Sequence, residues 1–265
     1  MTQTYETLLY EEGDGVAVVM LNRPDVYNAF NRAMQRELSE LWQSLRTNDD
    51  VRCVVLAAAG DKAFCTGIDR SEITAEGAGD FDPLTYEDPG KKLGPKSNEL
   101  YKPVIAAVHG MACGGAFYML GEVDFIVAST DATFFDPHVT YGMTAVYEPL
   151  LMMRRMPYGE IARLTLMGAH ERMSAQRAYE IGLVSQVVAL EELEETTLGL
   201  AKAIASQPAR AVQATVRAMW LARSLSPDQA DAMGAELLNN GFTAEALEEG
   251  QKVFESGKRI EWRLR

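Results

Sequence analysis

The 265-residue sequence contains little cysteine, few basic residues and no long apolar run. Its three cysteines, Cys53, Cys65 and Cys113, are odd in number and widely spaced. This spacing supports neither a disulfide framework nor a CxxC metal or redox site. No stretch approaches the roughly 18 apolar residues that span a bilayer, and the first residues lack a signal-peptide pattern. We therefore expect a soluble protein of the reducing cytoplasm, with no membrane partner and no bound metal.

Positive charge is also scarce, because 25 lysines and arginines face 38 aspartates and glutamates. The resulting net charge of -13 argues against a nucleic-acid partner, since counterion release needs a dense basic face. Hydrophobic residues make up 47% of the chain, which is enough for a sizeable globular core. The length favours one large domain, or one domain with an appendage.

Short apolar, β-branched runs alternate with helix-like patterns over residues 1–190. A helix that buries one face is expected after Asn31, and two shorter helices are expected at Gly114–Leu120 and Ser174–Ile181. Strands separated by helices need crossover connections, so the pattern predicts an α/β fold. The expected strands are Thr7–Tyr10, Val16–Leu21, Val51–Ala58, Val104–Val108, Phe125–Ala128 and Leu183–Val188.

Strand signals stop after Leu190. Residues 191–265 are therefore expected to form a helical module, separate from the core of residues 1–190. Such a module cannot easily close its own core, so it should pack on the α/β body or on another subunit. The helices expected there are Glu191–Ser206, Arg210–Ser224, Pro227–Asn239 and Ala244–Ser256.

One long segment, Glu72–Asn98, carries three prolines and four glycines but few apolar anchors. Segments of this length without clear secondary structure are uncommon in compact domains and are often functional. We expect a mobile loop with partial helices rather than packed core.

Two glycine-containing turns carry the clearest chemical signal. Lys62–Asp69 reads KAFCTGID after a predicted strand, and His109–Ala116 reads HGMACGGA between a strand and a helix. Turns of this kind present unpaired backbone N–H groups, which suit a developing negative charge. Facing each other, the two turns would form an oxyanion hole. Either turn alone is explained more simply as a tight strand–helix connection.

With three further segments, these turns resemble the crotonase, or enoyl-CoA hydratase/isomerase, superfamily over nearly the whole chain. The resemblance implies a crotonase-like spiral core of ββα units and a C-terminal helical trimerisation module. It also implies an acyl-CoA substrate, assembly as a homotrimer or hexamer, and no cofactor beyond the coenzyme A of the thioester. The matching segments, in the family's order, are LNRPDVYNAFN at 21–31, AFCTGID at 63–69, KPVIAAVHGMACGG at 102–115, SA with GLV within 168–184, and EGQKVF with KR near the end.

The resemblance also implies roles for individual residues. The backbone N–H groups of Ile68 and Gly115 would form the oxyanion hole. Lysine and arginine near the C-terminus would face the nucleotide phosphates, although a solvated helix end explains them equally well. The residues implied to bind coenzyme A are Lys62, Ala63, Thr66, Ile68, Lys258 and Arg259.

The sequence departs from the family's hydratase pattern at two positions. Family hydratases hold a water between two glutamates, but Tyr118 and His138 stand at the matching positions here. A phenol with a pKa of about 10 is a poor base, whereas an imidazole with a pKa of about 6.5 is close to the optimum for a general base. The substitution therefore favours isomerase-type proton transfer by His138 over simple hydration.

Two alternatives stay open at this point. His138 could activate water to hydrolyse a thioester or a β-diketone, or the site could bind acyl-CoA without turnover. Glu148 could raise the basicity of His138 by direct contact, or could face solvent at the start of a helix. The acyl pocket is expected to be broad and partly aromatic, with Tyr141, Met143 and Tyr147 as candidate lining residues.

Four other residues of the turns are interpreted as structural. Asp69 is expected to cap the segment that follows it. Cys65 and Cys113 are expected to be small turn fillers, and His109 to be a hydrogen-bonded structural histidine.

Overall fold

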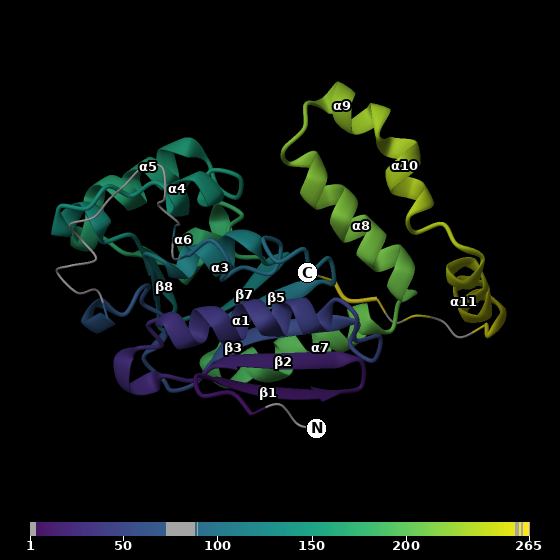
Figure 1. The fold of residues 1–265 in the computed structure, drawn as a ribbon, viewed down its shortest axis with the longest axis horizontal. Coiled ribbons are helices and arrows are strands. Elements are labelled where there is room, and N and C mark those ends of the chain that lie inside the picture. The colour runs from purple at the N-terminus through teal and green to yellow at the C-terminus, as the bar shows by residue number, and fades with distance from the viewer. Residues whose placement is uncertain (1–3, 73–87, 89, 258–259, 261, 265) are drawn as a thin grey trace.

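The computed structural model describes residues 4–72, 88, 90–257, 260 and 262–264. A six-stranded sheet in the order β1-β2-β3-β5-β7-β10 forms its centre (Figure 1). The first two strands form an antiparallel hairpin, and every later neighbour is parallel. The predicted α/β fold is confirmed. The strands are β1 (Leu8–Gly13), β2 (Val16–Leu21), β3 (Cys53–Ala58), β5 (Val104–Val108), β7 (Phe125–Ser129) and β10 (Gln186–Val188).

A second, four-stranded sheet was not predicted, because its strands are only two or three residues long and show no periodicity. Its order is β4-β6-β8-β9, and its first three strands are parallel. β4, β6 and β8 each follow a strand of the large sheet directly in sequence, which generates the spiral of repeated units. The strands are β4 (Ala63–Cys65), β6 (Met111–Cys113), β8 (Thr133–Phe135) and β9 (Met173–Ser174).

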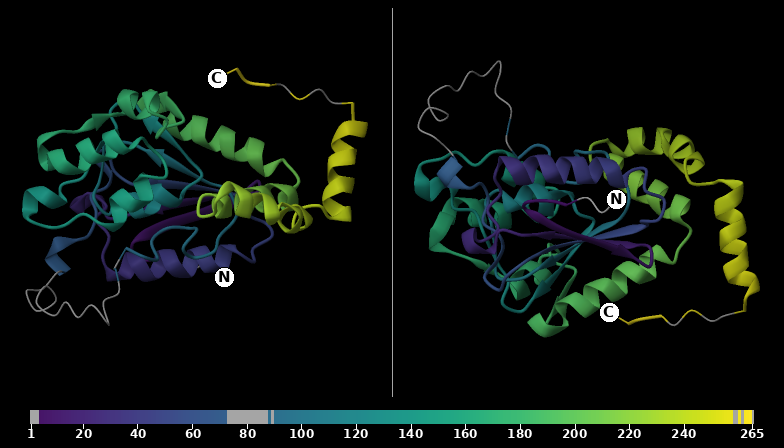
Figure 2. Two further views of the ribbon diagram at one scale, coloured as in Figure 1. Left: turned by 90° about the horizontal axis from the view of Figure 1, so that it is seen from above. Right: turned by 60° about the horizontal axis from the view of Figure 1, so that its bottom comes forward.

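Two helices, α1 (Arg32–Leu45) and α7 (Leu193–Ala205), cover the two faces of the large sheet (Figure 2). Val54 of β3 packs in the cluster that contains the buried face of α1. The next residue, Val55, packs with α7 on the other side. Successive side chains of a strand point to opposite faces, so β3 is buried on both, as its continuous apolar run predicted.

Beyond α7, the chain forms helices that project from the sheet (Figure 1). The expected helix Pro227–Asn239 is broken at Met233, which ends α9 and precedes α10. The other expected C-terminal helices are present, with ends displaced by a few residues. The elements are α8 (Ala209–Ala222), α9 (Pro227–Ala232), α10 (Gly234–Asn239) and α11 (Ala244–Glu255).

Most of the expected loop Glu72–Asn98 lies outside the described residues, namely 73–87 and 89. Its final part contradicts the expectation of a loop without packed core. The Leu93 side chain is fully buried, and its carbonyl accepts a hydrogen bond of 2.9 Å from Nε1 of Trp42. Leu93 and a Ser39–Asn98 hydrogen bond of 2.8 Å anchor this segment to α1, and neither contact is visible as a sequence pattern. Among the helices described, none has the length and apolarity needed to cross a membrane.

Candidate functional site

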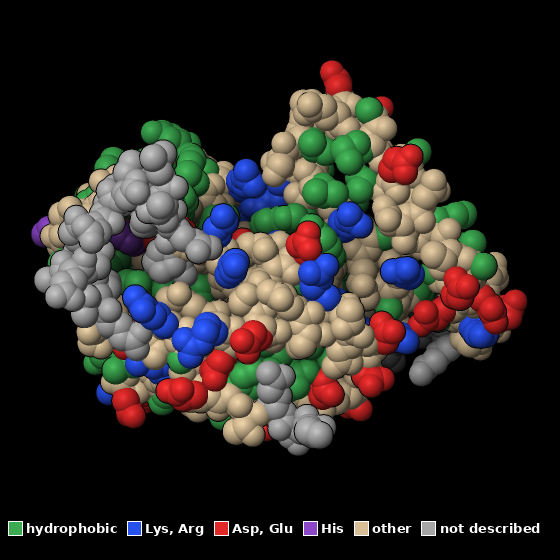
Figure 3. Space-filling model, in the orientation of Figure 1, with side chains coloured by type: hydrophobic (Ala, Val, Ile, Leu, Met, Phe, Trp, Pro, Cys, Tyr) green, Lys and Arg blue, Asp and Glu red, His purple; other side chains and the backbone are tan. Residues whose placement is uncertain are grey.

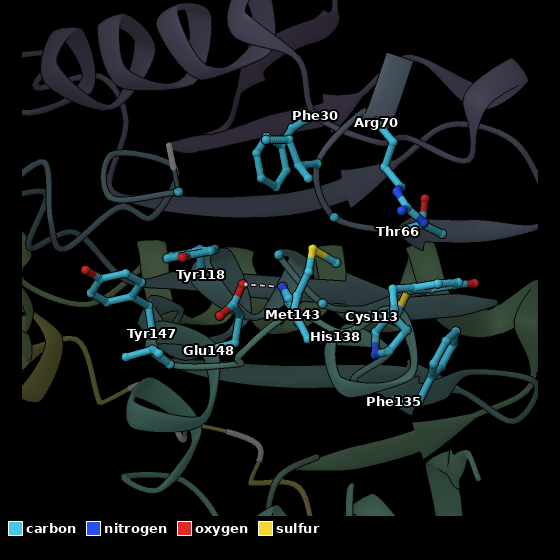
Figure 4. A pocket seen from close by; sticks show the side chains of 18 of the residues that line it. Phe30, Thr66, Arg70, Cys113, Tyr118, Phe135, His138, Met143, Tyr147 and Glu148 are labelled. Carbon is cyan, nitrogen blue, oxygen red and sulfur yellow. Dashed lines mark ion pairs between the residues drawn. The ribbon is translucent and has the colours of Figure 1, made fainter. Parts of the chain in front are cut away.

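Both glycine turns open onto one pocket of about 900 Å³. Phe30, Thr66 and Arg70 lie on one side of it, and Tyr118, His138 and Glu148 lie on the other (Figure 4). The turns follow β4 and β6 of the small sheet, whose parallel pairing brings them together. The histidine follows β8, the next strand of that sheet, and the glutamate lies on α4 (Tyr147–Met152). The small sheet that the sequence did not reveal therefore positions most of the site.

The two turns touch each other through their glycines. A Cβ on Gly67 would lie 2.9 Å from the backbone nitrogen of Gly115. A Cβ on Gly115 would lie 3.2 Å from the Cα of Gly67 and 2.5 Å from a ring carbon of Phe30. Gly67 also has φ +88°, a conformation that side chains rarely adopt. Glycine is therefore required at both positions for the turns to approach this closely.

Hydrogen bonds around the first turn leave the Ile68 amide available. Phe30 N donates to Gly67 O and Asp69 N donates to Phe30 O, each at 2.8 Å, so the amide of Ile68 falls between them. The described residues provide no hydrogen-bond acceptor for Ile68 N or for Gly115 N. Two adjacent, uncommitted N–H groups at a pocket wall can stabilise an oxyanion.

Asp69 fixes the first turn from outside the pocket. Its Oδ1 accepts hydrogen bonds from Ser71 N and Ser71 Oγ at 3.0 and 2.7 Å, and its Oδ2 lies 2.8 Å from Nη2 of Arg23. The Ser71 hydrogen bonds and the Arg23 charge hold its pKa below the ordinary value against the opposing effect of burial. The residue acts as a structural cap, in line with the sequence interpretation.

His138 is held by a carboxylate at each ring nitrogen. Nδ1 lies 2.5 Å from Oδ1 of Asp136, and that oxygen also accepts the backbone N–H of His138 at 3.1 Å. Nε2 lies 3.5 Å from Oε1 of Glu148, as the dashed line in Figure 4 marks. The Asp136 hydrogen bond raises the pKa of His138 above its ordinary value, with further help from the charges of Asp136 and Glu148, while burial opposes the rise.

Glu148 is only 5% exposed, so the solvent-facing alternative for this residue is wrong. Burial is the main reason that its pKa is raised, and the charges of Asp136 and Asp88 add to the effect. His138 acts in the opposite direction. A buried carboxylate beside an imidazole favours the protonated form of the ring, and the protonated ring favours the ionised carboxylate.

Tyr118 also forms a pair with a carboxylate. Its hydroxyl donates to Oδ1 of Asp88 at 2.8 Å, and both residues line the pocket. Burial raises the pKa of Asp88, whereas the Tyr118 hydrogen bond lowers it. A Cβ on Gly90 would lie 2.2 Å from the Tyr118 ring, so that glycine makes room for the phenol.

Sequence reasoning missed Asp88 and did not give Asp136 its role beside His138. Asp88 lies 30 residues from Tyr118, and no local pattern connects the two. Asp136 lies two residues before His138, across Pro137, so the Asp-Pro-His spacing was a signal that could have been used.

Four of the six residues expected to bind coenzyme A belong to the first turn, namely Lys62, Ala63, Thr66 and Ile68. Lys62 and Ala63 line a smaller pocket of about 240 Å³, and Thr66 lines the large one. Tyr27 lines both, so the two pockets adjoin, and Nζ of Lys62 lies 5.9 Å from the centre of its ring. The remaining two expected residues, Lys258 and Arg259, lie outside the described residues.

Burial keeps three other titratable groups of the two turns neutral, namely Cys65, Cys113 and His109. Burial raises the pKa of the Cys65 and Cys113 thiols to about 12, so neither is a thiolate near neutral pH. Burial lowers the pKa of His109, and a hydrogen bond with the backbone of Gly60 holds the ring as expected, although its Nε2 has no partner among the described residues. Within the described ranges, no three metal-ligating side chains cluster in a way that could hold an ion.

Comparisons with known proteins agree with this geometry. Residues 11–264 match the family model described as enoyl-CoA hydratase/isomerase. The (E)-benzylidenesuccinyl-CoA hydratase of Thauera aromatica is 33% identical over 81% of this chain and 82% of its own. The 1,2-epoxyphenylacetyl-CoA isomerase of Escherichia coli is 32% identical over 77% and 78%. The crystal structure of an enoyl-CoA hydratase/isomerase from Mycobacterium paratuberculosis superposes with a TM-score of 0.87 at 32% identity, covering 99% of this chain and 100% of the other.

Proposed function

Because the chain belongs to the enoyl-CoA hydratase/isomerase family, we propose that it shifts the double bond of an acyl-CoA thioester by proton transfer, with His138 as the base. The observation that carries the proposal is the pocket itself. It brings His138, with its carboxylate partners, to the same cavity as the uncommitted N–H groups of Ile68 and Gly115. A base and an oxyanion hole together are what enolate chemistry requires.

The reaction follows from these positions. Ile68 N–H and Gly115 N–H donate to the thioester oxygen, and each such donor contributes about 2.7–4 kcal/mol to transition-state stabilisation. Nε2 of His138 removes a proton from the carbon next to the double-bond system, and the electron pair of the broken C–H bond moves into the enolate. The imidazolium then returns the proton to the other end of the conjugated system. The double bond has moved, and no water has been added.

The carboxylate pairs support isomerisation over hydration. Hydration needs two acid–base groups, one that activates the water and one that protonates the substrate carbon. A pair of carboxylates can supply both. Tyr118 has its hydroxyl proton bound to Asp88, and a phenol is a poor base near neutral pH. We therefore assign Tyr118 the role of lining and orienting the acyl group, and Glu148 that of stabilising the His138 imidazolium.

Coenzyme A would enter as part of the thioester and lie along the first turn, over Lys62, Ala63, Thr66 and Ile68. Tyr27, which lines both pockets, supports this path from the large pocket to the small one. We also retain Lys258 and Arg259 as candidates for its phosphates. The free, buried cysteines fit a reducing cytoplasm.

A homotrimer or hexamer built through the C-terminal helices is part of the proposal. Hydrophobic side chains gather between α8 and α10 (Figure 3), where a groove runs between the helices. Leu238 and Phe242 are about two-thirds exposed on this part of the chain, and Phe254 of α11 is 85% exposed. Apolar surface of this extent is typical of a subunit interface.

The proposal is tested by deuterium uptake from heavy water into short, long, cyclic and aryl acyl-CoAs, followed by mass spectrometry. We expect uptake by the wild-type protein and its loss, by about 100- to 10,000-fold, in His138→Ala. His170→Ala is the matched control, because His170 is exposed and does not line the pocket.

Two outcomes would overturn the proposal. Absence of uptake despite measurable acyl-CoA binding would leave a binding protein. Release of free coenzyme A that depends on His138, without exchange at carbon, would identify a hydrolase instead.

A further inference from the structure

We propose that Asp136 is a positioning residue that fixes the His138 ring with its proton on Nδ1 and the lone pair of Nε2 toward the pocket. The inference rests on the proposed function for its catalytic consequence, but not for its geometry. It assigns the two carboxylates beside His138 different tasks: Asp136 sets the resting form of the ring, and Glu148 stabilises the protonated form.

A single carboxylate oxygen of Asp136 makes two contacts to His138. Oδ1 of Asp136 accepts the backbone N–H of His138 at 3.1 Å and lies 2.5 Å from Nδ1 of its ring, where an ionised carboxylate can only accept a hydrogen. Pro137 between them has φ -84° and ψ -1°, which folds the chain tightly enough for both contacts. One carboxylate oxygen thus fixes the backbone and the ring of the same residue.

The burial of Asp136 also favours this arrangement. Asp136 is 1% exposed, and its Oδ2 has no hydrogen-bond partner among the described residues. A carboxylate removed from water is stabilised by a close hydrogen-bond donor and even more by a cation. Asp136 therefore favours a proton on Nδ1 in the neutral ring and favours the imidazolium over the neutral ring.

The His138 ring lies beside the second turn. A Cβ on Gly114 would lie 3.6 Å from Cε1 of His138 and 3.7 Å from Cδ of Pro137, so both rings lie against this turn. Gly115, the next residue, supplies one of the two uncommitted N–H groups. With Nδ1 tied to Asp136, rotation of the ring is prevented and Nε2 keeps a fixed position relative to that amide.

Among the described residues, few charged or titratable groups act on the ring. Asp136 from its own segment and Glu148 from α4 both favour the imidazolium. The Cys113 thiol of β6 is neutral, and the Arg172 guanidinium stacks on Phe135, 4.4 Å from the ring centre. Across the pocket, the Tyr118 proton is bound to Asp88. Any loss of basicity at His138 is therefore attributed to one of two carboxylates, and variants can separate them.

Asp136 and Glu148 act at different stages of the proton transfer. Before the reaction Nδ1 carries the ring proton and Nε2 is free to accept one. After Nε2 takes the substrate proton, the imidazolium donates to Asp136 through Nδ1 and faces Glu148 through Nε2. The contact to Glu148 at 3.5 Å is thus an ion pair of the intermediate, whereas the contact to Asp136 exists in both states.

The test reads the ring directly, by nitrogen NMR of protein labelled with ¹⁵N-histidine. The chain has three histidines, so His138→Ala identifies the His138 signals by their loss. In the wild-type protein we expect the neutral ring to be protonated on Nδ1. In Asp136→Asn we expect the tautomers to mix or to invert, because the side-chain NH₂ can donate to Nδ1, and the imidazole pKa to fall.

Activity gives the second readout. Asp136→Asn should lower the rate of deuterium exchange by about 100- to 10,000-fold with little change in KM, because the wrong tautomer removes the base but not the binding surface. Glu148→Gln should leave the resting tautomer unchanged. Circular dichroism and binding of a non-reactive acyl-CoA analogue control for folding.

The possible results separate the positioning role of Asp136 from the proposed reaction. A wild-type ring protonated on Nε2 would overturn the inference without any variant, as would an Asp136→Asn protein with an unchanged tautomer and pKa. If the tautomer depends on Asp136 but the wild-type protein exchanges no deuterium on any substrate, the positioning role stands and the proposed isomerisation fails. Exchange that survives in Asp136→Asn with an altered tautomer would show that His138 is not the base.

Discussion

Two of the aromatic polar side chains that line the pocket, His138 and Tyr118, are each bound to a carboxylate, and their chemistry differs. His138 donates through one ring nitrogen to Asp136 and keeps a second nitrogen for the substrate. Tyr118 has one proton and gives it to Asp88. The first carboxylate strengthens a base, whereas the second occupies an acid. His138 therefore has a second ring nitrogen left to act on the substrate, whereas the single hydroxyl of Tyr118 is already bound to Asp88.

After the loss of His138 or Asp136, the largest loss of activity is expected for Glu148→Gln. The glutamine removes the negative charge that faces the His138 imidazolium, so turnover should fall by about 10- to 100-fold. Glu148 raises the pKa of His138, and its removal should therefore move the acidic limb of the kcat/KM profile to lower pH. Deuterium exchange measured from pH 5 to 9 reads both effects.

Glu191→Gln is the control for that variant, because Glu191 is exposed and lies far along the chain in η5 (Leu190–Glu192). An acidic limb that stays in place in Glu148→Gln would show that Glu148 does not act on His138. A limb that moves to higher pH would reverse the assigned sign of the interaction.

Tyr118→Phe should break the second pair at much smaller cost to the reaction. The phenylalanine keeps the ring beside Gly90 and removes only the hydroxyl, so exchange should fall by less than about tenfold, as expected for one neutral hydrogen bond. Asp88 loses its donor, and its pKa should rise further because the Tyr118 hydrogen bond lowers it. Exchange rates and urea unfolding, with the exposed Tyr158→Phe as control, measure the two consequences.

A loss in Tyr118→Phe as large as that in His138→Ala would contradict the division between the two pairs. It would make the phenol a second proton-transfer group and would reopen hydration as the reaction. Uptake of a hydroxyl group by the substrate, seen as an added mass of water, would identify that case.

The two pairs also show which parts of the site could be predicted from the sequence. Strands such as Val104–Val108 were found because five consecutive buried residues leave a clear apolar run. The short strands that position the site have no such run. Only Glu148 and Met152 of the six residues of α4 are buried, so this helix was anticipated only within one alternative for Glu148. The residues at the turns were located through local motifs. Their carboxylate partners were harder to predict, because Asp88 contacts Tyr118 only in the folded chain.

The smallest expected effect concerns stability, and it separates the two pairs by their pH dependence. The pKa of His138 is raised in the folded protein, so its stabilising contribution is complete below the unfolded pKa of about 6.5 and is lost as the pH rises through the folded pKa. The difference in unfolding free energy between wild type and His138→Ala should therefore be largest in mildly acidic solution and should shrink toward pH 9. His170→Ala should follow the wild-type curve, and a difference for His138→Ala that grows with pH would mean that the folded protein holds His138 neutral. Urea unfolding at a series of pH values therefore tests, without any substrate, whether the carboxylates around His138 favour its protonated form.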